Sequence, residues 1–397
     1  MAELYKTISE DWVRKGKEEL GIDRKSQGKL SEMGIAMEDN ISTKGILTRA
    51  GSKMLENYIP PFNASIIDNL LLEDAEIKGK FQAREFGVGG YIDNSMASLV
   101  KSRRVAASIG VDTCGEIGRL SSEYDLYGFK PSYGSISRYG LISSMPSFET
   151  VGVLSNSVDT ISILFDVMSK RNKQDSTSVD FKEEERDIKK IEEVKITILE
   201  EDVEVLNSTE KSSLEKLIEE FKKEFSFKYL ELPSIKYCQS IFNILGSGEL
   251  ASNMGRFDGL FYGHRVENYK GLEDYIKKNR TEGFSDGLKK KIMFGNFVLN
   301  DRNYEKYYGK SQRVRALIKH EFQAGIEDFD IIVRPTRKDS ERQGLLSNIV
   351  GCPSMNLPVN EDGIGIQIIA GMYKEKLLFD FGRYYERNIL KEAVRHG

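Results

Sequence analysis

The stretch Val111–Gly140, VDTCGEIGRLSSEYDLYGFKPSYGSISRYG, decides how the rest of this 397-residue sequence is interpreted. It has the order of a catalytic loop: Asp112-Thr113, a tight turn at Cys114-Gly115, and then one functional side chain at position 116. A buried turn over Gly128–Pro131 and a glycine-rich exit follow. Residue 116 is a glutamate, and a carboxylate lacks the hydroxyl group that a nucleophilic serine would supply. Whether the protein is an enzyme therefore depends on this position.

The overall composition is that of a water-soluble protein. Charged residues make up 30% of the chain, and the net charge of −4 provides no general attraction to nucleic acid or anionic membranes. Residues 1–23 lack the apolar core of a signal peptide, and no apolar run is long enough to span a membrane. The three cysteines are too widely spaced for a disulfide framework or a zinc site. We expect a cytoplasmic protein with no membrane attachment and no independent binding of nucleic acid.

Hydrophobic periodicity predicts helices that alternate with strands. The expected helices cover residues 9–20, 64–72, 96–108, 158–168, 209–225, 235–254, 303–329 and 377–391, and the expected strands cover 34–37, 76–79, 194–199, 229–232, 331–333 and 365–369. Such alternation is typical of an α/β fold in which helices cover both faces of a mixed central sheet. We expect a single domain over residues 1–397, with a polar excursion at 173–193.

Several segments in order along nearly the whole chain resemble the amidase signature family. They are GIAMEDNI (34–41), SKMLEN (52–57), the stretch 111–140, ASNMGRFDG (251–259), YGHR (262–265) and GIQII (365–369). The RFDG and YGHR pieces favour the branch formed by the A subunits of glutamyl-tRNA(Gln) amidotransferases. The resemblance implies an amidase-like α/β fold, hydrolysis of glutamine for tRNA-dependent amidation in translation, no cofactor, and B- and C-type subunits as partners.

The same resemblance implies a Ser-Ser-Lys triad, and this chain differs at all three places. Glu38 stands where the family has its lysine base, and Glu116 stands where it has the nucleophilic serine. The Gly/Ser-rich loop that carries the second serine is missing after residues 85–95. A serine nucleophile needs a base to take its proton and backbone N–H groups to hold the oxyanion. We therefore predict that the fold is kept, the glutaminase chemistry is lost, and the protein acts in binding, as a scaffold or as a regulator.

The family geometry places Glu38 and Glu116 close together in one pocket. Its other expected members are Asp39, Asp112, Thr113, Cys114, Gly115 and Arg119. The favoured interpretation is that loss of the loop opens this pocket to water, where unpaired glutamates cost little. Cys114 occupies a glycine position of the turn, so we interpret it as a small buried residue and not as a nucleophile.

Three alternatives remain open from the sequence. Glu38 and Glu116 could share a proton, or hold a divalent cation together with Asp39 and Asp112, and so support a changed enzymatic chemistry. The chain could still be a working member of a transamidation complex, or a decaying paralogue without function. The basic cluster Lys289–Lys291 is interpreted as part of a solvated helix face in preference to a contact with tRNA phosphates.

Overall fold

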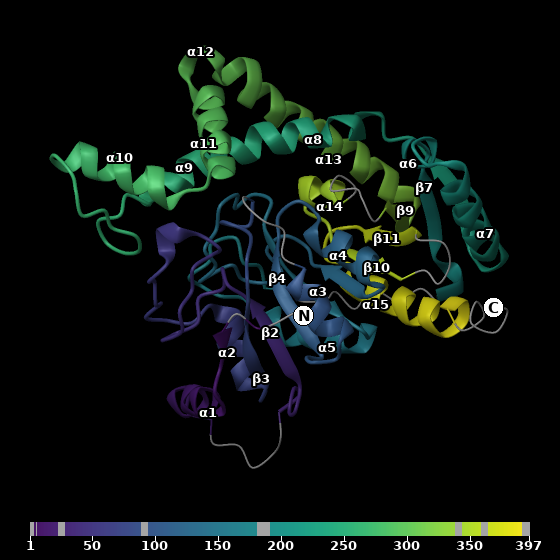
Figure 1. Cartoon of the computed structure of the whole chain (residues 1–397). Coiled ribbons are helices and arrows are strands. Elements are labelled where there is room, and N and C mark those ends of the chain that lie inside the picture. The colour runs from purple at the N-terminus through teal and green to yellow at the C-terminus, as the bar shows by residue number, and fades with distance from the viewer. Residues whose placement is uncertain are drawn as a thin grey trace.

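A mixed β-sheet runs through the middle of the molecule (Figure 1). The computed structural model describes residues 4, 6–22, 28–88, 94–180, 191–337, 344–358 and 364–390. Within these residues the strands follow the order β1-β3-β2-β4-β6-β5-β10-β11-β9-β7-β8. Their bounds are β1 (Lys6–Thr7), β2 (Gly34–Glu38), β3 (Glu76–Phe81), β4 (Ala107–Asp112), β5 (Tyr127–Lys130), β6 (Thr150–Ser155), β7 (Lys195–Leu199), β8 (Ser226–Leu230), β9 (Ile331–Arg337), β10 (Ser354–Leu357) and β11 (Ile364–Ala370).

The sheet has parallel pairs toward both ends and antiparallel pairs in its centre. Strand β2 pairs in parallel with β3 and β4, and β7 pairs in parallel with β8 and β9. The strands from β4 through β6, β5, β10 and β11 to β9 are antiparallel neighbours. The expected mixed α/β sheet is confirmed.

Helices cover both faces of this sheet. Their bounds are α1 (Glu10–Glu19), α2 (Ser65–Leu72), α3 (Ser95–Lys101), α4 (Glu116–Tyr124), α5 (Val158–Met168), α6 (Glu200–Glu204), α7 (Ser208–Glu224), α8 (Cys238–Ile241), α9 (Ser247–Asn253), α10 (Leu272–Gly283), α11 (Asp286–Leu299), α12 (Asp301–Tyr304), α13 (Lys310–Asp328), α14 (Leu345–Val350) and α15 (Glu375–Tyr384). On one face, Ile331 and Val333 of β9 join a core with α2, α5, α7 and α15. Ile332 between them joins a core with α8, α9, α13 and α14 on the opposite face. Strand β9 therefore contributes to two apolar layers, one on each face of the sheet.

A group of helices extends from the sheet layers on one side of the molecule. Helices α9 to α12 form this projection, and α13 leads back from it toward the sheet (Figure 1). The predicted helices at 235–254 and 303–329 both lie in this region and continue through short π-helical turns at Phe242–Gly246 and Glu305–Gly309. No helix in the described ranges is long and apolar enough to cross a membrane.

The helix predicted over 96–108 is too long. Helix α3 ends at Lys101, and Arg103 then adopts a left-handed conformation with φ of 57°, so the chain turns and enters β4. The predicted turn at Gly128–Pro131 is wrong as well, because Tyr127–Lys130 is a buried strand. Strands such as β6 are buried on both faces, so they lack the alternation of polar and apolar residues that identifies a half-exposed strand.

The predicted helix at 158–168 is confirmed with the same bounds as α5, and Ser9 caps α1 as expected. In the polar excursion, residues 173–180 form turns without a helix or strand, and residues 191–193 form a single 3₁₀ turn. Residues 181–190 lie outside the described part of the chain. The prediction of a single domain remains untested.

Candidate functional site

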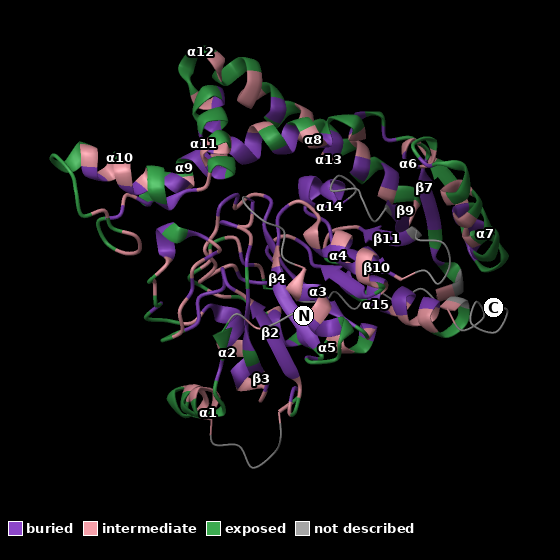
Figure 2. Cartoon of the chain, viewed as in Figure 1, coloured by how far each residue is buried: buried purple, intermediate pink, exposed green. Residues whose placement is uncertain are grey.

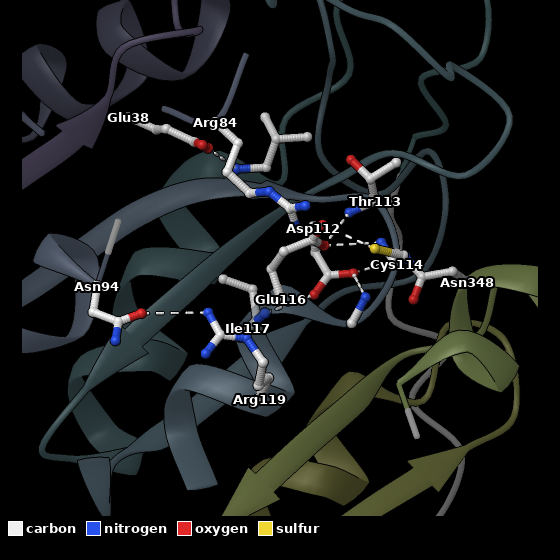
Figure 3. Close-up of polar contacts among 12 residues, drawn as sticks. Glu38, Arg84, Asn94, Asp112, Thr113, Cys114, Glu116, Ile117, Arg119 and Asn348 are labelled. Carbon is white, nitrogen blue, oxygen red and sulfur yellow. Dashed lines mark hydrogen bonds and ion pairs between the residues drawn. The ribbon is translucent and has the colours of Figure 1, made fainter. Parts of the chain in front are cut away.

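The residues singled out in the sequence gather where β2 and β4 end. These strands are parallel neighbours, so Glu38 and Asp112 lie at the same edge of the sheet. Gly115, with φ of 92°, then turns the chain directly into α4. The first residue of α4 is Glu116, whose side chain lies beside Asp112, Thr113 and Cys114 (Figure 3). A Cβ atom on Gly115 would lie 2.5 Å from the Cα atom of Gly344. Only glycine therefore fits this turn, both for its backbone conformation and for the close approach of the segment that begins α14.

The Glu116 carboxylate is bound by the turn that precedes it. Its Oε2 atom accepts the backbone N–H groups of Thr113 at 2.9 Å and Cys114 at 2.8 Å. Its Oε1 atom accepts the thiol of Cys114 at 3.0 Å and lies 3.9 Å from the Arg84 guanidinium. The side chain is only 15% exposed. The expectation of an unpaired, water-exposed glutamate is corrected here, because backbone and thiol donors replace water around this group.

Asp112 holds the turn in place. Its Oδ1 atom accepts the backbone N–H of Gly115 at 3.0 Å and the side-chain amide of Asn348 at 2.7 Å. Its Oδ2 atom accepts the backbone N–H of Ile117 at 2.9 Å, in the first turn of α4. Burial, followed by the negative charge of Glu116, raises the pKa of Asp112 to about 6. Asp112 is therefore a positioning residue that joins β4, α4 and α14.

Glu38 is bound separately from Glu116. Its Oε2 atom accepts the backbone N–H of Val111 at 2.6 Å (Figure 3). Burial raises the pKa of Glu38 to about 8, the Val111 N–H opposes that change, and the charge of Glu116 adds to it. At neutral pH Glu38 therefore holds a proton. Within the described ranges no group of three or more histidine, cysteine or acidic side chains has the geometry to hold a metal ion.

We expect the pKa of Glu38 to make stability depend on pH. Because the folded-state pKa is raised from 4.5 to about 8, the stability gained by the protonated group is complete below pH 4.5 and is lost as the pH rises through 8. Glu38→Gln should remove this loss. Between pH 4.5 and about 8, the difference in free energy of unfolding between the variant and the wild type should shift in favour of the variant by roughly 1.4 kcal/mol for each unit of rising pH. Urea titrations of both proteins at several pH values provide the measurement, and parallel pH profiles would contradict the expectation.

Asp39 belongs to a different cluster on the sheet. Its Oδ1 atom lies 3.8 Å from the ammonium group of Lys80 on β3, and both side chains are fully buried. The backbone N–H of Arg49 donates to both Asp39 oxygens at 3.2 Å. Burial raises the pKa of Asp39 to about 6, although Lys80 opposes the change, and burial also lowers the pKa of Lys80 to about 8. Asp39 is thus engaged in an ion pair and is not part of the Glu116 turn.

Arg119 also lies outside the pocket that the sequence predicted. Its guanidinium bonds Glu123 at 2.6 Å along α4 and reaches Asn94 at 3.4 Å, so it points away from the Glu116 carboxylate (Figure 3). The cation beside Glu116 is Arg84, which the sequence interpretation did not identify. Burial and the neighbouring Glu116 charge raise the pKa of the Cys114 thiol well above its usual value, so Cys114 is a poor nucleophile here.

A known protein family accounts for this arrangement of strands and turns. The sequence model of the amidase family matches residues 5–379 of this chain. This chain belongs to the amidase family. It is 32% identical to the A subunit of the glutamyl-tRNA(Gln) amidotransferase of Archaeoglobus fulgidus, a match that covers 96% of this chain and 91% of that protein. It is 33% identical to the A subunit of the same amidotransferase from Clostridium botulinum strain Kyoto, with 98% and 90% coverage.

Solved structures of other proteins have the same fold. The crystal structure of the glutamyl-tRNA(Gln) amidotransferase A subunit from Thermotoga maritima matches with a TM-score of 0.73 at 22% identity, over 96% of this chain and 91% of that chain. A structure of 6-aminohexanoate cyclic dimer hydrolase with its substrate matches with a TM-score of 0.74 at 13% identity, over 95% of this chain and 87% of that one. The expected amidase-like architecture is confirmed.

Proposed function

We propose that this amidase-family chain is a non-catalytic relative of the glutamyl-tRNA(Gln) amidotransferase A subunits. It acts through binding, as a scaffold or regulator, with B- and C-type amidotransferase subunits as its partners. The similarity to A subunits over nearly the full length supports the choice of partners. The chain composition is compatible with a cytoplasmic location for such a complex.

The observation that carries this proposal is the placement of the Glu116 carboxylate. In the family an amide carbonyl becomes an oxyanion next to the nucleophile, and backbone N–H groups of the turn must stabilise it. Here the N–H groups of Thr113 and Cys114 are bound to the chain's own carboxylate. Glu116 therefore replaces the nucleophilic hydroxyl and also fills two donors that such an oxyanion would use. A substrate carbonyl would have to displace a bound negative charge from this position.

The lysine base that the resemblance implies is also replaced, by Glu38, and this change too weakens the catalytic machinery. With a pKa of about 8, most of Glu38 is protonated at neutral pH, so only a minor fraction is free to take a proton from a hydroxyl group. No cofactor or metal is part of the proposal. Loss of both the nucleophile and the base supports a binding role more strongly than either change alone.

We expect the purified protein to release no ammonia from glutamine above the buffer background, alone or with its cognate B and C subunits. Glu116→Ser should remain equally inactive, because Glu38 still stands in the place of the lysine base. An intact homologue that keeps the full triad, assayed with its own partners, provides the positive control. Substantial ammonia release that Glu116→Ala abolishes would show that the proposal is wrong.

A second candidate function is an amidase with changed chemistry in which Glu38 acts as the general acid. The raised pKa of Glu38 favours it, because a carboxyl group that holds its proton near neutral pH can donate it to a leaving amine. The same ammonia assay, extended to simple primary amides, separates the two candidates. Amide hydrolysis that is lost in Glu38→Gln would favour this second function and exclude the non-catalytic one.

A further inference from the structure

Helix α11 has two faces of different character. Its inner face, which includes Leu288, Ile292 and Val298, is buried against the neighbouring helices. Gly295 on this face crosses α9 so closely that a Cβ atom would lie 2.0 Å from the carbonyl oxygen of Ser247. Packing of this kind fixes the rotation of α11 and so determines which residues face outward.

The outward face of α11 is apolar where a solvated helix would be polar. Met293 is 71% exposed and Phe297 is 48% exposed. The rings of Phe294 and Phe297 are stacked with their centroids 6.3 Å apart, and the centroids of the Phe297 and Tyr307 rings are 5.5 Å apart. Figure 2 shows that α11 and α12 lie on the exposed projection of the molecule. Clustered apolar side chains on a projecting helix are typical of an interaction surface.

Basic residues surround these apolar side chains. Lys290 lies about one turn before Met293 and Phe294, and Lys306 lies 5.3 Å from the centre of the Tyr307 ring. Among the described residues neither lysine has an ion pair within 4.0 Å. Two nearby acidic side chains are paired with other cations, Asp286 with Lys289 and Glu305 with Arg313. We call this set the α11 patch; it consists of Lys290, Met293, Phe294, Phe297, Lys306 and Tyr307. The patch is locally basic on a chain whose net charge is −4.

We propose that the α11 patch docks an acidic amphipathic helix of the partner protein. This inference rests on the proposed function, which supplies the partner, and it adds the surface and the chemistry of the contact. An amphipathic helix matches a row of apolar and aromatic anchors one helical turn apart, and its acidic flank complements Lys290 and Lys306. The patch contains only the two lysines Lys290 and Lys306, whereas electrostatic affinity for RNA requires many phosphate contacts, so a protein partner is favoured over RNA.

The test is a calorimetric titration of the full-length chain with the purified B and C subunits of the same organism. We expect Met293→Ser/Phe297→Ser to weaken binding at least about tenfold, because aromatic anchors dominate such interfaces. Lys290→Glu/Lys306→Glu should weaken binding too and reduce its dependence on salt. The matched control is Val205→Ser/Tyr229→Ser, whose residues are 62% and 49% exposed outside the patch; its affinity should equal that of the wild type. Circular dichroism should show all variants folded, since each change is on the surface.

The outcomes separate the surface from the function. Wild-type binding that the patch variants leave unchanged overturns the assignment of the surface and leaves the proposed function standing. Equal weakening in the control double variant also overturns the assignment. Absence of binding by the wild type overturns the proposed partnership itself. Self-association that is lost in Met293→Ser/Phe297→Ser would assign the patch to a second copy of this chain, and patch-dependent binding of total tRNA would assign it to RNA; both results reject the helix.

Discussion

Lys80→Met is expected to lower the free energy of unfolding by about 3–5 kcal/mol. Lys80 and Asp39 are both fully buried and 3.8 Å apart, so removal of the ammonium group leaves a carboxylate without its main compensating charge. The Lys80 ammonium also donates to the hydroxyl of Thr48 at 2.5 Å, and this bond is lost as well. Urea unfolding at neutral pH, followed by circular dichroism, measures the difference.

The same strand offers a matched control. Lys78 forms an ion pair with Glu76 at 2.5 Å, and both side chains are about half exposed. Lys78→Met should change the free energy of unfolding by no more than about 1 kcal/mol, because water already solvates these charges. Lys80→Met/Asp39→Asn should recover part of the stability lost in Lys80→Met, since it removes the stranded charge. A loss in Lys80→Met no larger than in Lys78→Met would show that the buried pair is not important for stability.

Asp112→Ala is expected to cost about 3 kcal/mol or more of stability and to loosen the turn that holds Glu116. The substitution leaves the backbone N–H groups of Gly115 and Ile117 without their acceptor. It also removes one of the two acceptors of the Asn348 side-chain amide, which still donates to the carbonyl oxygen of Phe148 at 3.1 Å. The loss of stability can be measured by urea unfolding. A probe of the turn itself is the Cys114 thiol, which should react faster with Ellman's reagent in the variant.

Two features make the thiol measurement specific. Cys238 and Cys352 are buried, so Cys114 is the most accessible of the three thiols. Asp166→Ala, on the exposed side of α5, should leave both stability and thiol reactivity within error of the wild type, because surface substitutions rarely exceed about 0.5 kcal/mol. An Asp112→Ala protein as stable as this control would contradict the positioning role of Asp112.

The sequence was sufficient for elements whose pattern is local. The apolar spacing of Val158–Met168 predicted α5 with its bounds, and Ser9 predicted the start of α1. The predictions failed where strands are buried on both faces. In β6, all six residues from Thr150 to Ser155 are buried, so no alternation marks the strand. Its identity depends on pairing with β4 and β5, which are distant contacts.

In the candidate site, too, the sequence identified residues in short local stretches but not the partners that come from distant parts of the chain. Glu38, Asp112 and Glu116 were identified from the sequence because each lies in a short recognisable stretch, Glu38 in residues 34–41 and the other two in residues 111–140. Two of their partners were not. Asn348, which donates a hydrogen bond to Asp112, comes from the far end of the chain, and Arg84, whose guanidinium lies 3.9 Å from Glu116, comes from another segment. Arg119 was placed in the pocket by its nearness in sequence, whereas α4 turns it toward Glu123.

Lys80 illustrates what a sequence pattern cannot show. In a regular strand Lys78 and Lys80 would lie on the same face, and both would be expected in water. The pairing of β2 with β3 shifts register between Ile35 and Ala36, so that Ile77 and Gly79 face consecutive residues and Lys78 is the extra residue of a bulge. The bulge turns Lys80 into the interior beside Asp39.

The sequence by itself determined the family, the α/β class and the identity of the side chains at positions 38 and 116. Those properties depend on local motifs and on which atoms each residue carries. Only the tertiary structure decided what the stretch Val111–Gly140 does with its glutamate, because the N–H groups of Thr113 and Cys114 become donors to Glu116 only when Gly115 and Gly344 meet and Asp112 fixes the turn. Burial is a property of the whole fold, and it is burial that raises the pKa of Glu38 to about 8.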